Sequence, residues 1–134
     1  MAIQNALTVD VEDYFQVSAF AKNIDYSNWD KHPLRVEKNT HRLLDLFDEA
    51  QVKGTFFILG WVADRNKNLV EEIAQRGHEV ASHGYSHQLV YNQTREVFRE
   101  ETFRSKKLLE DIIQKPVYGY RAASYSITER SLWA

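Results

Sequence analysis

Short apolar segments alternate along the chain with longer segments whose apolar residues recur at helical spacing, and this alternation constrains the fold most. The short segments are residues 6–9, 54–59, 78–82 and 117–121. The longer ones are residues 34–51, 62–76 and 94–114, and a further helix is expected to begin within residues 127–134. Strands that alternate with helices pair in parallel through right-handed crossovers. The sequence therefore predicts an α/β fold built from parallel β-α units.

Three local patterns add detail to this prediction. The residues Phe98, Thr102, Ser105, Leu109 and Ile112 follow one another at steps of four, three, four and three, which predicts one apolar helix face. Residues 54–59 form a continuous β-prone run, as in a strand that is buried on both faces. Gly77 stands where a glycine usually caps the C-terminus of a helix, here the helix expected over residues 62–76.

In a parallel sheet, the carboxyl ends of all strands lie at the same edge, and functional residues gather there. The segments that follow the four predicted strands are residues 10–13, 59–61, 83–87 and 121–126. We therefore expect these four segments to lie close together and to contain the functional site.

Composition excludes several classes of protein. The 17 basic and 19 acidic residues are interspersed, so no basic surface for nucleic acid is expected. The chain has no cysteine, which excludes disulfides and thiolate metal sites. The longest apolar run, residues 55–63, is too short to span a membrane. No signal-peptide pattern is present at the N-terminus, so a cytoplasmic location is the expectation.

Two histidines and an acidic cluster point to a metal site. His83 and His87 are four residues apart, and both could reach one ion if the segment made a helical turn. Two imidazoles and one carboxylate would leave positions for water and substrate on a divalent ion. Along an extended strand Asp10 and Glu12 share one side, which favours Glu12 as the third ligand. A bulge could instead turn Asp13 inward, so Asp13 stays an alternative.

Further candidates come from the ends of other predicted strands. Arg121 could hold Asp10 ionised and oriented through two parallel hydrogen bonds. Trp61 and Tyr125 are candidate substrate-binding aromatics, although core packing is the more common role for a tryptophan such as Trp61. The serines of these segments lack a nucleophile elbow, which argues against a serine hydrolase.

Three blocks of sequence, residues 8–15, 77–87 and 119–126, resemble the polysaccharide deacetylase family, also called the NodB-homology or carbohydrate esterase family 4 domain. The likeness is greatest to the branch with peptidoglycan deacetylases and allantoinase-like members, and within it to exopolysaccharide-associated enzymes. It implies a distorted (β/α) barrel, of which residues 1–134 would form a single partial domain, truncated at its C-terminus. It also implies metal-dependent removal of N-acetyl groups from an amino-sugar polymer.

The resemblance assigns roles residue by residue. Asp10 matches the catalytic base, His83 and His87 match the metal-binding histidines, and Arg121 matches the arginine that orients the base. Glu12, with Asp13 as the alternative, falls where the metal-binding carboxylate belongs. The ion would be one divalent transition metal, with zinc expected and cobalt, nickel or iron possible.

The sequence also departs from the family pattern. The first block lacks the usual adjacent pair of aspartates, and Ala123 stands in place of a proline. The family's later motifs, including the histidine that protonates the leaving amine, are not in this sequence. Two alternatives therefore stay open: an allantoinase-like ring amidohydrolase, and a non-catalytic module that binds a glycan or a partner. An open barrel edge would also favour self-association.

Overall fold

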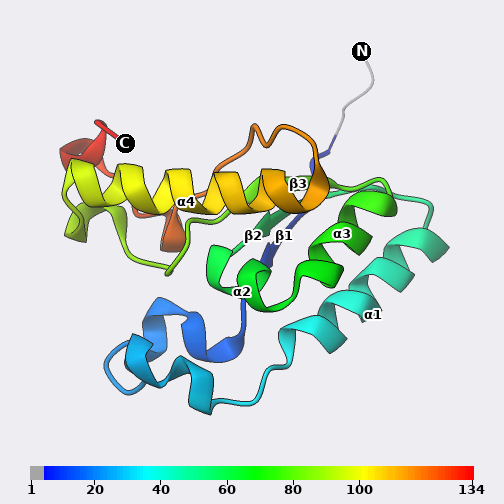
Figure 1. The fold of residues 1–134 in the computed structure, drawn as a ribbon, viewed down its shortest axis with the longest axis horizontal. Helices are drawn as coiled ribbons and strands as arrows, with labels where there is room; N and C mark the ends of the chain where they lie inside the picture. Colours follow the sequence, from blue (N-terminus) through cyan, green and yellow to red (C-terminus); the bar gives the residue numbers. More distant parts are fainter. Residues whose placement is uncertain (1–4) are drawn as a thin grey trace.

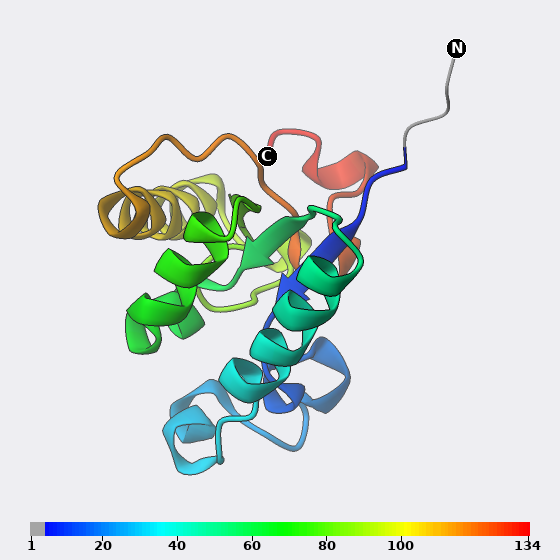
Figure 2. The ribbon, with the colours of Figure 1, turned by 90° about the vertical axis from the view of Figure 1, so that its right-hand side faces the viewer.

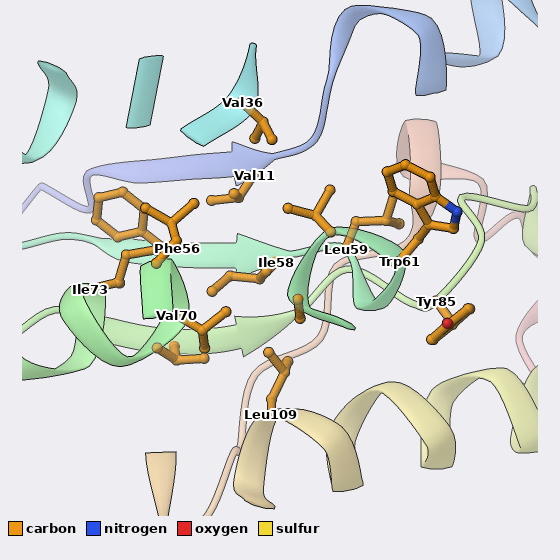
Figure 3. Packing of buried hydrophobic residues seen from close by; sticks show 14 of the residues in the cluster. Val11, Val36, Phe56, Ile58, Leu59, Trp61, Val70, Ile73, Tyr85 and Leu109 are labelled. Atoms are coloured by element: carbon orange, nitrogen blue, oxygen red, sulfur yellow. The ribbon is translucent and has the colours of Figure 1, made fainter. Parts of the chain in front are cut away.

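The computed structural model describes residues 5–134, and a three-stranded parallel sheet runs through its centre in the order β1-β2-β3. The strands are β1 (Thr8–Val11), β2 (Thr55–Ile58) and β3 (Glu79–Ser82). In the register, Asp10 pairs with Phe57, and Phe57 pairs with Ala81. The three arrows point the same way in Figure 3. The prediction of parallel β-α units is therefore confirmed.

Four α-helices connect and follow these strands (Figure 1). They are α1 (Val36–Glu49), α2 (Gly60–Arg65), α3 (Lys67–Gln75) and α4 (Arg95–Ile113). Helix α1 joins β1 to β2, α2 and α3 join β2 to β3, and α4 follows β3. The described residues include no helix that is long and apolar enough to cross a membrane.

Burial along the strands shows that the helices cover one side of the sheet. Val11, Phe56 and Ile58 are at most 1% exposed, and they pack with Val70 and Leu109 in the core shown in Figure 3. Burial in β2 alternates between intermediate and buried, so the prediction of a strand buried on both faces is wrong. The other side of β1 and β2, which carries Asp10 and Phe57, is only partly buried.

The segment predicted as one helix over residues 62–76 is two helices, α2 and α3. Asn66 separates them with φ −132° and ψ 54°, values outside the helical region. Its side-chain amide donates to the carbonyl of Val62 at 3.1 Å, which closes the end of α2. Gly77 follows α3 with φ +82°, and its N–H donates to the carbonyl of Ala74, as expected of a glycine cap.

The fourth predicted strand, residues 117–121, is reduced to a single parallel bridge between Tyr120 and Ser82. Side chains of α4 form hydrogen bonds with the backbone N–H and carbonyl of Val117, which a strand would use to pair with its neighbour. Its N–H donates to the carboxylate of Glu110 at 2.9 Å, and its carbonyl accepts from the Lys106 ammonium. The helix expected from residue 127 is likewise only a short 3₁₀ turn, η6 (Glu129–Ser131).

Between β1 and α1 the chain forms a lobe of short 3₁₀ helices over residues 14–31. These are η1 (Tyr14–Gln16), η2 (Ser18–Phe20) and η3 (Tyr26–Lys31). Both ribbon views show this lobe extending from the carboxyl end of β1, on the side away from α4 (Figures 1 and 2). The remaining short turns, η4 (Val90–Asn92) and η5 (Ala123–Tyr125), lie in the loops that follow β3 and the Tyr120 bridge.

Candidate metal centre

Glu12, His83 and His87 come together at the carboxyl ends of β1 and β3. One ligand atom of each lies within 4.8 Å of the other two. Glu12 Oε2 is 2.8 Å from His87 Nε2 and 3.9 Å from His83 Nε2. Both imidazoles are buried, and the Glu12 side chain is 18% exposed. The arrangement therefore directs two nitrogens and one carboxylate oxygen toward a common point.

The loop between the two histidines is not a helical turn. Gly84 and His87 instead have left-handed backbone angles, φ +74° and +54°, which fold residues 83–87 back on themselves. The N-terminus of α2 anchors this loop, because the N–H of Gly60 donates to the Gly84 carbonyl at 2.8 Å. The close approach of the loop explains Gly60, since a Cβ there would lie 2.5 Å from the Tyr85 ring.

Helix α4 holds the same loop from the other side. Glu101 accepts two hydrogen bonds from Ser86, one from its N–H at 3.0 Å and one from its hydroxyl at 2.5 Å. Ser86 directly precedes His87, so these two bonds restrict the backbone that carries the imidazole. Carboxylates that position a metal ligand in this way influence metal affinity.

The surroundings of His83 determine its tautomer and its charge. Its Nδ1 lies 2.8 Å from the backbone carbonyl of Arg121. A carbonyl oxygen can only accept, so Nδ1 carries the proton and the lone pair of Nε2 points toward Glu12. Burial lowers the pKa of His83, which keeps the ring neutral at neutral pH. Neutral imidazole with a free Nε2 is the form that binds metal ions.

The residues fit a divalent transition metal. Glu12 Oε2 is buried and makes no hydrogen bond among the described residues, although it lies 2.8 Å from His87 Nε2. A buried carboxylate oxygen that faces imidazole nitrogens without a hydrogen bond is unfavourable unless a cation compensates its charge. Two imidazoles and one carboxylate are also a common ligand set for zinc and related ions, with further positions left for other ligands.

Asp10 lies beside this group, but an arginine holds it. Arg121 Nη1 donates to Asp10 Oδ1 at 2.6 Å, while Nη2 donates to the hydroxyl of Thr8 at 2.9 Å. The guanidinium therefore contacts two side chains of β1. The prediction that Arg121 makes two parallel hydrogen bonds to Asp10 is wrong. The guanidinium carbon also lies 4.0 Å from the centre of the Phe57 ring. Asp10 Oδ2 stays free of Arg121 and is 3.9 Å from His83 Nε2.

Asp13 is turned away from the histidines. Its side chain is buried and accepts from the backbone N–H groups of Tyr14, Arg35 and Val36, at 2.9, 2.6 and 2.9 Å. It thus caps η1 and satisfies the first turn of α1 at the same time. Both of its carboxylate oxygens therefore accept hydrogen bonds from the backbone.

The two aromatic candidates differ in exposure. Trp61 is 3% exposed, and its ring packs against Phe15, Trp29 and the Arg65 guanidinium. It belongs to the core beyond the end of β2 (Figure 3) and presents no free face to a sugar. Tyr125 is 76% exposed, with its ring centre 5.8 Å from the guanidinium carbon of Arg121.

Sequence reasoning missed two residues that support the site. Thr8 has the same strand parity as Asp10, so its place beside Arg121 could have been found by extending the strand from residues 6–9 to Val11. Glu101 lies on the polar surface of α4, and no pattern in the sequence separates it from the other glutamates of that helix. Only the packing of α4 against the rest of the fold brings it to Ser86.

Comparison with known proteins identifies the family. The family model for polysaccharide deacetylase matches residues 19–134. The chain therefore belongs to the polysaccharide deacetylase family. The matched region includes His83, His87 and Arg121, whereas Asp10 and Glu12 precede it.

A curated relative and two solved structures extend this comparison. A peptidoglycan-N-acetylglucosamine deacetylase of Bacillus cereus is 30% identical over 78 residues, which are 58% of this chain and 37% of the relative. The structure of a mutant of a Bacillus anthracis CE4 family pseudoenzyme has a TM-score of 0.74 at 19% identity, covering 96% of this chain and 39% of that one. Peptidoglycan deacetylase PdaC of Bacillus subtilis gives 0.70 at 18% identity, covering 93% and 51%.

Proposed function

We propose that this chain supplies the metal-binding and base-bearing part of a deacetylase that removes N-acetyl groups from an amino-sugar polymer. The observation that carries the proposal is the grouping of Glu12, His83 and His87 beside an Asp10 that Arg121 holds. The membership of the chain in the polysaccharide deacetylase family supports it. The chain spans 37% of the length of its Bacillus cereus relative, a peptidoglycan-N-acetylglucosamine deacetylase.

In this proposal, Glu12, His83 and His87 hold one divalent ion, with zinc as the expected metal. When bound, such an ion polarises a carbonyl and lowers the pKa of water. The engagement of Asp13 with three backbone amides favours Glu12 as the carboxylate ligand. The hydrogen bond from His83 Nδ1 to the Arg121 carbonyl keeps the ring in the orientation that a ligand needs.

Asp10 is the general base of the proposed reaction. Arg121 occupies its Oδ1 and orients the carboxylate, while Oδ2 faces the metal ligands and is available to take a proton. The Thr8 hydroxyl accepts from the other guanidinium nitrogen, Nη2. Both nitrogens of Arg121 therefore contact β1, which holds the guanidinium in place beside the Asp10 carboxylate. The exposed Tyr125, beside Arg121, would contact the sugar.

The test compares the parent chain with His83→Ala and with His41→Ala. His41 is a half-exposed histidine of α1 that contacts Glu37 and Glu72, away from the site, and serves as the matched control. Metal content is measured by elemental analysis after dialysis against a weak chelator. Acetate release is then measured on N-acetylglucosamine oligomers, peptidoglycan and acetylated exopolysaccharide.

We expect about one equivalent of metal and release of acetate in the parent and in His41→Ala, and neither in His83→Ala. Metal binding without acetate from any of the three glycans would favour a non-catalytic binding module. Hydrolysis of allantoin in place of the glycans would favour a ring amidohydrolase. Equal metal content in the parent and His83→Ala would contradict the proposed ligand set.

A further inference from the structure

The two histidines of the candidate metal centre differ in how the second nitrogen of each ring is held. His83 Nδ1 lies 2.8 Å from the Arg121 carbonyl, whereas His87 Nδ1 is buried without a hydrogen-bond partner among residues 5–134. The His87 side chain is 3% exposed, and its Nε2 faces Glu12 Oε2 at 2.8 Å. An imidazole that binds a metal ion through Nε2 carries its proton on Nδ1. His87 Nδ1 then needs an acceptor inside the protein.

Gln93, which directly follows η4, has an unpartnered acceptor. Its Nε2 donates to the Gln88 carbonyl at 2.9 Å. A carbonyl oxygen can only accept, so this bond fixes which end of the Gln93 amide is NH₂ and which is oxygen. The oxygen, Oε1, is buried and has no partner within the described part of the chain. His87 and Gln93 therefore leave a donor and an acceptor that complement each other.

Both residues line one small cavity of about 10 Å³. A volume of about this size holds the centre of a single water molecule, and a buried water makes about three hydrogen bonds. Glu101 lines the same cavity and already supports the loop by accepting two hydrogen bonds from Ser86. A water here can accept from His87 Nδ1 and donate to Gln93 Oε1 and to the Glu101 carboxylate.

We propose that Gln93 is a positioning residue for His87 and that it acts through one buried water in this cavity. The inference rests on the proposed function, because it concerns His87 in its metal-binding form. The water accepts from Nδ1 and donates to Gln93 Oε1, and this bridge fixes the orientation of the ring. Partners of this kind also make the coordinating nitrogen more basic, which strengthens metal binding.

The test compares two replacements of Gln93. Gln93→Met removes both the acceptor and the donor that binds the Gln88 carbonyl. Gln93→Glu also loses that donor but keeps an acceptor oxygen, so it separates the bond to the water from the bond to Gln88. Gln114→Met is the matched control, because Gln114 also donates from Nε2 to a backbone carbonyl, that of Asp111, at the C-terminal end of α4.

Zinc affinity of the full chain is measured by competition with a coloured chelator, and thermal unfolding of the metal-free proteins checks that each variant folds. We expect Gln93→Met to weaken zinc binding about tenfold. Gln93→Glu and Gln114→Met should bind zinc within about threefold of the parent. Equal weakening in both Gln93 variants would assign the effect to the bond with Gln88 and overturn the inference, as would unchanged affinity in Gln93→Met.

A second measurement follows the His87 ring by NMR of the zinc-loaded, ¹⁵N-labelled protein. The Nδ1–H of His83 is an internal reference, since it is bonded to the Arg121 carbonyl. In the parent, the His87 Nδ1–H should show a nuclear Overhauser contact with a bound water. In Gln93→Met this contact should be lost and the His87 signal should move, while the His83 signal stays in place. Absence of the water contact in the parent, or a His87 signal that Gln93→Met leaves unchanged, would overturn the inference.

The same measurements separate this inference from the proposed function. If the parent binds zinc and releases acetate while Gln93→Met matches it in zinc affinity and in the His87 signal, the deacetylase proposal stands and this inference fails. If Gln93→Met loses zinc affinity and its His87 signal moves while the parent releases no acetate, Gln93 is a positioning residue and the deacetylase proposal fails. A parent that binds no zinc would overturn both.

Discussion

Replacing Asp13 or Glu12 by alanine should have opposite effects on stability and on metal binding. Asp13 accepts three backbone hydrogen bonds, and each buried bond of this kind contributes about 1 kcal/mol net. Asp13→Ala should therefore lower the free energy of unfolding by about 3 kcal/mol, in line with the loss of two caps. For a chain of this length that corresponds to a fall of about 10 °C in Tm.

Glu12→Ala should behave differently because Glu12 Oε2 makes no hydrogen bond within the described residues, and its close contacts there are to the imidazoles of the proposed ligands His83 and His87. Its removal should change the free energy of unfolding of the metal-free protein by less than about 1 kcal/mol. Metal affinity should fall strongly, since one of three ligands is lost.

The assay is thermal unfolding by circular dichroism with a chelator present, because bound metal would itself raise Tm. Metal content is determined separately on folded protein. If Asp13→Ala unfolds like the parent and loses its metal, while Glu12→Ala keeps metal, then Asp13 is the ligand, Glu12 is not, and the reasoning is refuted.

Three further predictions concern single side chains. Arg121→Lys should lower the rate of acetate release about tenfold at unchanged metal content, because the single nitrogen of lysine replaces two guanidinium nitrogens that separately contact Asp10 and Thr8. Gly60→Ala should lower the free energy of unfolding by about 2 kcal/mol in a denaturant titration, since its Cβ would overlap the Tyr85 ring. Burial lowers the pKa of His78 below its unfolded value, so the unfolded chain binds more protons and stability should fall as the pH drops below about 6.5. His78→Asn, which keeps an acceptor for the Gly54 N–H, should weaken this pH dependence, and unfolding titrations at several pH values would show whether the two slopes differ.

The parallel architecture could be predicted because it follows from local periodicity. Helices α1 and α4 have the apolar faces that their spacing predicts, and Gly77 caps α3 because its left-handed backbone suits glycine. The break at Asn66 could not be predicted, because the apolar spacing continues across it. The prediction of a fourth strand was wrong because side chains of α4 satisfy the backbone of Val117. Sequence patterns do not show where α4 packs in the fold.

In the site too, the features that follow from local sequence spacing could be predicted, and those that depend on contacts between distant residues could not. The alternation of side chains along a strand predicts that Asp10 and Glu12 lie on one side, and the parallel arrangement predicts that they lie near His83. In the structure, both carboxylates have an oxygen 3.9 Å from His83 Nε2. The metal-binding and catalytic roles of these residues stay predictions until metal and activity are measured. The environment of Asp13 could not be predicted, because its partners Arg35 and Val36 are 22 and 23 residues away along the chain. The unpartnered oxygen of Gln93 likewise emerges only once the loop that follows β3 is folded.

The contact between Arg121 and Asp10 joins residues that are 111 positions apart in the sequence. The β-α units between them can form from local contacts as the chain emerges from the ribosome, but the site cannot close until residue 121 has been synthesised. A metal ion that binds Glu12 and the two histidines would link the first strand to the third. Such binding would stabilise the closure of the long loop between β1 and the residues after β3, and it would depend on both of these strands being in place.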